Sequence, residues 1–437
     1  MSICEPGCDS NHQNADLCKT PFILQALCWT PSGKPAKFGA MSNAGDDQRA
    51  RSESGPSAAG RVASDIGGAF GDLGTFLPHV LGAITVAGLA PVGVLSGFGL
   101  CYVATGLFYR LPIPVQPMKA VSAVLITSGL SAGEIAASGL CLGLVLLVLG
   151  ITGAISRFAR IVPQSVITGL QLGLGITLAL LSLELMAGQP WLGIVTAVLL
   201  LATLRVPRCP ATLVALGAAI VLGHFADVDA AWPDIAWAAP AWPVWRLPGL
   251  GDFERALGSA VLPQLPLTLT NAVIVTAALA HDFYGERAAR ATPRNLALSS
   301  GLANLLLAPF GALPMCHGAG GLAAHRRFGA RTGLAPVILG ILLLGLGIML
   351  ADQAGSLLAL VPLAAVGALL LFSAADLALS KRLFDARPSC WPVIGVTAAA
   401  TAWLDPFWGL LAGALAELLR GQIIALLRGR APSRPPR

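Results

Sequence analysis

The fold is decided by residues 111–120, which read LPIPVQPMKA. Three prolines, at positions 112, 114 and 117, exclude a regular helix here and favour an extended backbone. Pro117 suits the first turn of a helix that continues to about residue 130, because the N–H that proline lacks would have no partner there. Lys119 would then lie inside an apolar stretch. The pattern predicts an extended segment that turns into a short helix.

A second interrupted segment covers residues 309–322 and reads PFGALPMCHGAGGL. Its Pro314-Met315 pair matches Pro117-Met118, and glycines follow at 318, 320 and 321, where backbone could approach a ligand closely. Each short helix would direct unpaired N–H donors, and about half a positive charge, at a shared cavity. Together with Lys119, the two N-termini predict a site for a doubly charged oxyanion. A simple proline kink is the alternative for each segment.

The composition around these segments is that of a membrane protein. The chain has 437 residues, of which 55% are hydrophobic and 11% are charged. Soluble domains carry about 25% charged residues, so an ordinary soluble protein is excluded. The net charge of +6 lies mainly in the tails and short loops, which does not suggest a nucleic-acid-binding surface.

The apolar stretches predict about fourteen crossings of the bilayer. A crossing helix needs about 20 apolar residues, although several stretches here are shorter. Twelve stretches are uninterrupted, and the segments 112–131 and 310–326 are counted as broken crossings. The twelve are 66–88, 89–109, 134–156, 162–186, 190–204, 211–226, 257–280, 295–309, 332–351, 355–373, 390–404 and 406–427.

The charges of the loops test this count. Basic residues gather on one side only if both broken segments cross, as the preference for positive charge on the inner side requires. The predicted inner loops hold Arg110, Arg157, Arg160, Arg205, Arg208, Arg287, Arg290, Arg294, Arg326, Arg327, Arg331, Lys381, Arg382 and Arg387. The predicted outer loops hold only Arg246 and Arg255. Both termini are therefore expected in the cytoplasm.

The crossings divide into two halves around a polar break. We expect a disordered cytoplasmic tail over 1–61, seven crossings over 62–226, an external linker over 227–256, seven crossings over 257–428, and a basic tail over 429–437. Seven crossings per half would invert the second half relative to the first, as in many transporters. The linker carries Trp232, Trp237, Trp242 and Trp245, which suit the membrane interface. Either Met1 or Met41 could be the true start.

Polar residues of the spans that open each half are expected to face the broken helices. Asp72 and Thr75 lie in the first span, within GDLGTFLP (71–78). Asp72 is a candidate proton carrier, because burial and neighbouring charges change the balance between its charged and neutral forms. Alternatively, Asp72 is only a structural partner for Lys119. We interpret Glu184 and Asp376, near span ends, as interfacial.

The eighth span offers neutral groups in LPQLPLTLTNA (262–272), namely Gln264, Thr268, Thr270 and Asn271. These could donate hydrogen bonds to an oxyanion or bond only between helices. We expect Gln116 to donate as well, and Met118, Cys316, His317, Gly318 and Gly320 to line the cavity. No metal site and no cofactor are expected, since His317 and His325 have no third ligand at a suitable spacing.

These stretches, with PVQPMKA (114–120) and LPMCHGAGGLAAHRRFGARTG (313–333), resemble the molybdate transporter family, which is related to the SulP sulfate permeases. The resemblance implies an all-α polytopic membrane protein with core and gate domains, and a site between spans 1, 3, 8 and 10. It implies molybdate uptake, with sulfate or tungstate as competitors. The chain ends soon after its last span, without the STAS domain of typical SulP permeases, so a homodimer is possible but less certain.

The sequence thus predicts a secondary active transporter of the plasma or inner membrane that imports molybdate, with protons as the expected coupling ion. Lys119 and the two helix N-termini would hold the anion, and Asp72 would carry the proton. The alternatives are a sulfate or other anion permease of the same fold, a passive anion channel, and a membrane enzyme that uses Cys316 and His317. The last is disfavoured because nothing is placed to orient His317.

Overall fold

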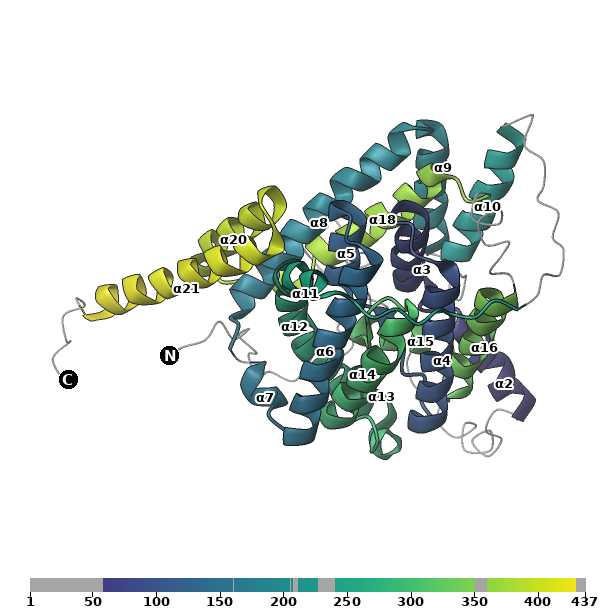
Figure 1. Ribbon diagram of the computed structural model, residues 1–437, viewed down its shortest axis with the longest axis horizontal. Helices are drawn as coiled ribbons and strands as arrows, with labels where there is room; N and C mark the ends of the chain where they lie inside the picture. The colour runs from purple at the N-terminus through teal and green to yellow at the C-terminus, as the bar shows by residue number, and fades with distance from the viewer. Residues whose placement is uncertain are drawn as a thin grey trace, which may run out of the picture.

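The computed structural model describes residues 58–159, 161–204, 206, 211–226, 240–349 and 360–429, which are mostly helical (Figure 1). Most of the predicted N-terminal tail, with the Met1 and Met41 alternatives, lies outside these residues. So do the first part of the Trp-rich linker, including Trp232 and Trp237, and the C-terminal tail from residue 430.

The described residues of the first half form ten helical elements. They are α2 (Ala58–Ala69), α3 (Leu73–Leu81), η2 (Gly82–Val86), α4 (Pro91–Tyr109), α5 (Lys119–Ser128), α6 (Ala132–Thr152), α7 (Ile155–Phe158), α8 (Gln164–Ala187), α9 (Pro190–Leu204) and α10 (Ala211–Ala226).

The second half begins after the linker, and its first helix is built from several consecutive pieces. The described elements of the second half are α11 (Leu250–Ala256), η3 (Leu257–Val261), α12 (Leu262–Leu267), η4 (Thr268–Val275), α13 (Thr276–Tyr284), η5 (Gly285–Ala288), α14 (Pro293–Leu307), η6 (Ala308–Phe310), α15 (Ala319–Arg327), α16 (Leu334–Met349), α18 (Leu363–Ala378), α19 (Lys381–Phe384), η7 (Pro388–Cys390), α20 (Trp391–Trp403) and α21 (Pro406–Gly429).

Many of these helices are suited to a bilayer. Among the described residues, six helices are long and apolar enough to cross a membrane, and five more are apolar but shorter. Large apolar side chains also face outward, as at Leu180, which is 63% exposed, and Leu418, which is 64% exposed. Such exposed apolar area fits contact with lipid. The exact number of crossings and the inverted repeat stay predictions.

The two interrupted segments meet in the middle of the molecule. Strand β1 (Gln116–Pro117) pairs antiparallel with β2 (Met315–Cys316), so that Gln116 lies opposite Cys316 and Pro117 opposite Met315. The N–H of Met118 donates to the carbonyl of Pro314 at 2.9 Å. The predicted meeting of the two segments is therefore confirmed. The predicted helix start at Pro117 is wrong, because Pro117 belongs to β1 and the helix begins at Lys119.

Close-packed glycines join the helices around this pair. Helix α4 packs along α16, and α6 packs along α14. A Cβ on Gly99 would lie 2.8 Å from the Gly340 carbonyl oxygen, and one on Gly143 would lie 2.9 Å from the Gly301 carbonyl oxygen. Only glycine permits such an approach of two backbones. We call these two helix pairs, together with α3, α5, α12 and α15, the first bundle.

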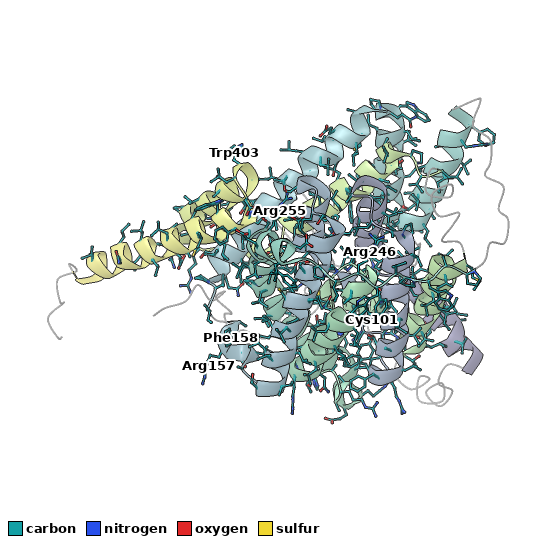
Figure 2. All side chains as sticks on the ribbon, in the orientation of Figure 1. Cys101, Arg157, Phe158, Arg246, Arg255 and Trp403 are labelled. Atoms are coloured by element: carbon teal, nitrogen blue, oxygen red, sulfur yellow. The ribbon has the colours of Figure 1, made fainter. Side chains whose placement is uncertain are left out.

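A second bundle is built on α8. This helix packs against α18 and α20, and α20 packs against α21. Gly175 lies against Ala374 and Ala378 of α18, which brings α8 and α18 close together. Figure 1 shows α20 and α21 projecting from the body of the molecule. Trp403, at the end of α20, is 83% exposed (Figure 2).

Several predicted boundaries were wrong. The eighth crossing begins at Leu250 rather than 257, because Asp252 accepts the N–H of Gly249 and caps the helix start. The helix predicted over 355–373 is α18, which runs from Leu363 to Ala378 and so contains Asp376. Arg255, in the last turn of α11, pairs with Glu134 at the start of α6, and Arg157 lies in α7, which follows α6 (Figure 2).

Candidate functional site

The first turn of α5 is capped by a side chain from the eighth crossing. The Gln264 Oε1 atom accepts the N–H of Ala120 at 2.8 Å and that of Val121 at 3.3 Å. The Gln264 Nε2 atom donates to the Thr268 hydroxyl at 2.9 Å. Gln264 and Thr268 are both buried. The amide oxygen therefore occupies the place where an anion at this helix N-terminus would accept hydrogen bonds.

The first turn of α15 faces a carboxylate from the first crossing. A Cβ on Gly321 would lie 2.6 Å from Asp72 Oδ2, and a Cβ on Gly318 would lie 1.7 Å from Gln116 Oε1. A side chain at either position would therefore have to displace the Asp72 or Gln116 side chain. Gly320, between them, has no atom near its Cβ position and is exposed. The N-terminus of α15 thus has Asp72 and Gln116 on one side and open space on another.

Asp72, Thr75 and Gln116 form one hydrogen-bonded cluster. The Asp72 Oδ1 atom accepts from Gln116 Nε2 at 2.6 Å and from the Thr75 hydroxyl. Gln116 Nε2 also donates to the Thr75 hydroxyl at 2.6 Å. The Oδ2 atom of Asp72 is buried and has no hydrogen-bond partner among the described residues. The carboxyl is therefore positioned by β1 and α3 while one of its oxygens stays unused.

Lys119 is paired with Asp376 across the two bundles. The Lys119 Nζ atom lies 2.6 Å from Asp376 Oδ2, and the two side chains are 26% and 42% exposed. The interpretation of Asp72 as the ion-pair partner of Lys119 is thus wrong. Asp376 lies inside α18 rather than beyond the predicted helix end at 373, but it is still close to the last residue, Ala378, and its interfacial position stays a prediction.

His79 makes a second connection at the same place. Its Nδ1 atom is 2.9 Å from the Ser122 hydroxyl of α5, and its Nε2 atom is 2.7 Å from the Ser373 hydroxyl of α18. All three side chains are buried. One histidine of α3 therefore bridges the helix that carries Lys119 and the helix that carries Asp376.

The other residues predicted to line the cavity are buried or bonded to the surrounding protein. Met118 is fully buried, and Cys316 is buried in β2. His317 bonds to the Ser299 hydroxyl and to the Pro114 carbonyl oxygen, both at 2.8 Å, so both of its ring nitrogens are engaged with the surrounding protein. Asn271 takes part in the helix through its carbonyl, which accepts from Thr276, and its amide makes no hydrogen bond to the described site residues.

Sequence reasoning missed three residues that organise this region. Asp376 and His79 lie in apolar helices, and a charged or titratable side chain in such a helix is a usable signal. Asn304 holds β2 in place, since its amide accepts from the Met315 N–H at 2.9 Å and donates to the Met315 carbonyl at 2.7 Å. Nothing in the spacing of Asn304 indicates that contact.

The first turns of both half-helices offer backbone N–H groups, although Gln264 caps α5 and Asp72 faces α15. Two helix N-termini meet at β1 and β2, and each offers backbone N–H groups. Lys119 adds a full positive charge, while the hydroxyl and amide groups around it can orient oxygen atoms.

A family model described as "Molybdate transporter of MFS superfamily" matches residues 64–178 and 256–377. The chain belongs to this molybdate transporter family. The match includes α3, α5, α12, α15 and α18, and therefore all the site elements described above.

Relatives within and beyond this family agree. The chain is 29% identical to molybdate transporter 2 of Arabidopsis thaliana, over 82% of this chain and 87% of the relative. It is 30% identical to molybdate transporter 1 of the same plant, over 77% and 84% of the two chains. A probable sulfate transporter of Mycobacterium tuberculosis is 26% identical, over 79% of this chain and 68% of that one. Membership of a family of membrane anion transporters follows.

Solved structures show the same fold at low sequence identity. The transmembrane domain of the cyanobacterial bicarbonate transporter BicA matches with a TM-score of 0.60 and 18% identity, over 81% of this chain and 97% of that domain. SLC26A9 matches with a TM-score of 0.63 and 13% identity, over 83% and 66% of the two chains. The molybdate transporter fold seen here is thus of the BicA and SLC26 type.

Proposed function

We propose that this chain is a secondary active transporter that imports molybdate together with protons by alternating access. The observation that carries the proposal is the β1–β2 pair, which joins the starts of two half-helices at one place inside an apolar protein. A tetrahedral dianion would accept from the α5 amides and from Lys119, replacing the Gln264 oxygen. Asp72, beside α15, would carry the proton.

Alternating access would proceed by movement of the second bundle against the first. The proposed core consists of the first bundle and contains both half-helices, whereas α18 belongs to the proposed gate. The contacts between Lys119 and Asp376, and between His79 and Ser373, join core and gate. Breaking and remaking polar contacts of this kind would let the site open to each side in turn.

Sulfate is the second candidate substrate. A probable sulfate transporter covers most of this chain, and sulfate shares the charge and tetrahedral shape of molybdate. The site described here is built from backbone amides, one ammonium and small polar groups, which suit either dianion. Enzyme chemistry at Cys316 and His317 is not proposed, because the relatives that match most of this chain are named as transporters.

Uptake by proteoliposomes tests these proposals. The purified full chain should accumulate labelled molybdate against its gradient when an inward proton gradient is imposed. Equilibration without accumulation would indicate a passive channel. Accumulation without any effect of the proton gradient would contradict proton coupling. Sulfate in excess that removes molybdate uptake would favour a general dianion permease.

A further inference from the structure

Two polar connections join α5 to α18. Lys119 and Ser122 lie three residues apart on α5, and Ser373 and Asp376 lie three residues apart on α18, so each pair shares a helix face. Lys119 bonds directly to Asp376, and Ser122 bonds to Ser373 through His79. The first connection is ionic and the second is neutral or singly charged.

The two connections differ in their access to solvent. Lys119 and Asp376 keep 26% and 42% of their side-chain area exposed, whereas His79, Ser122 and Ser373 are buried. The ion pair is therefore partly accessible, whereas the histidine connection is not. An anion arriving at the N-terminus of α5 would reach Lys119 first.

Such an anion would meet a carboxylate already in place. Asp376 lies 2.6 Å from the Lys119 ammonium, so an oxyanion on the same ammonium would sit within a few ångströms of the Asp376 oxygens. Like charges at that separation repel, although the partial exposure of both side chains weakens the repulsion. The carboxylate and the oxyanion therefore compete for one positive charge.

We propose that Asp376 is the internal counter-anion of Lys119: it holds the ammonium in the empty transporter and gives it up to the tetrahedral dianion. This inference rests on the proposed anion site at α5. In the empty state the pair keeps a charge inside the membrane compensated, which an unpaired Lys119 would not. When the dianion binds, the ionic connection between α5 and α18 is lost, so binding frees the second bundle to move.

A purely structural ion pair makes the opposite prediction for affinity. If Asp376 only positions Lys119 for the anion, removing its charge leaves affinity unchanged or weakens it. If Asp376 competes, removing its charge strengthens anion binding. The sign of the change in dissociation constant therefore separates the two roles.

The test is calorimetric titration of the purified full chain with molybdate, comparing wild type, Asp376→Asn and Glu417→Gln. We expect Asp376→Asn to bind molybdate about tenfold more tightly, since removal of one close competing charge changes affinity by at least this factor. Glu417→Gln is the matched control, because Glu417 also pairs with a cation in the second bundle, Arg420, and bonds to Ser165 of α8. Its affinity should equal that of wild type.

The outcomes distinguish this inference from the proposed function. Unchanged or weaker binding by folded Asp376→Asn, with normal wild-type binding, overturns the inference alone. A wild-type chain that binds neither molybdate nor sulfate overturns the proposed function and the inference together. Asp376→Glu, which keeps the charge, should retain an affinity near that of wild type, and a tenfold gain there would also contradict competition.

A measurement on the wild-type chain covers the case in which Asp376→Asn does not fold. Saturating molybdate should speed hydrogen–deuterium exchange in the C-terminal part of α18, residues 370–378, because its contact with α5 is released. Peptides from α16 in the first bundle serve as the internal reference. Unchanged or slower exchange in α18 would overturn the inference.

Discussion

Asp72 and Gln264 lie in crossed positions between the two halves of the chain. Asp72 comes from the first half and faces the first turn of α15 in the second, whereas Gln264 comes from the second half and accepts from the first turn of α5 in the first. Each also bonds to a threonine on its own crossing, Thr75 or Thr268. One half-helix start thus faces a carboxylate and the other a neutral amide, which makes α5 the better anion site.

The neutrality of Gln264 gives the first prediction. Gln264→Glu should keep the cap on α5, because a carboxylate oxygen can accept the same N–H groups and is favoured at a helix N-terminus. The added charge would occupy the proposed anion site permanently. We expect molybdate uptake to fall by more than about tenfold, while the unfolding temperature stays near that of wild type.

The control for this change is Gln189→Glu. Gln189 is an exposed glutamine just before α9, and its backbone carbonyl oxygen accepts N–H groups of that helix. Uptake by this variant should match wild type. Normal uptake by Gln264→Glu would mean that the anion does not bind at the first turn of α5.

The glycines of α15 give a second prediction. Gly318→Ala would place a methyl group 1.7 Å from Gln116 Oε1, so Gln116 must move and the cluster with Asp72 and Thr75 is disturbed. We expect a loss of about 1–3 kcal/mol in stability, typical of overpacking, together with reduced uptake. Gly320→Ala meets no atom within 4 Å and should unfold at the wild-type temperature. Thermal unfolding of both variants is the measurement, and equal stability would contradict the packing described here.

How far the sequence could predict this region depends on the kind of contact. The positions of the prolines and the repeated Pro-Met pair predict two extended segments of backbone. The structure brings these two segments together as β1 and β2. Backbone constraints of this kind are local and can be read from the residues themselves. The family resemblance, carried by the same residues, was also correct.

Side-chain partners could not be predicted in the same way. Asp72 was the partner considered for Lys119, whereas the structure pairs Lys119 with Asp376 of α18. The predicted helix end at 373, instead of Ala378, left Asp376 outside the helix. Gln264 was expected to donate to an anion, but its oxygen faces α5, since the unpaired amides of that helix start need an acceptor.

A third prediction concerns the energetic coupling of Lys119 and Asp376. Lys119→Ala should abolish dianion uptake and lower stability, because it leaves the Asp376 carboxylate without its partner. Adding Asp376→Ala should recover part of the stability but no uptake. Because both side chains are partly exposed, a double-mutant cycle should give a coupling of only about 1 kcal/mol. Uptake restored in the double variant would show that Lys119 does not hold the anion.

The final prediction concerns Asp72 and pH. If Asp72 carries the coupled proton, wild-type uptake rises as the external pH falls, because more protons are available to accompany the anion. Asp72→Asn keeps an acceptor for Thr75 but cannot exchange a proton, so its uptake should be low and flat with pH. Asp65→Asn is the control, since Asp65 is also buried in the first crossing but bonds to the backbone at Arg331 and Thr332. It should keep the wild-type pH dependence, whatever its effect on stability. An Asp72→Asn variant whose uptake still rises at low external pH would assign the proton to another group.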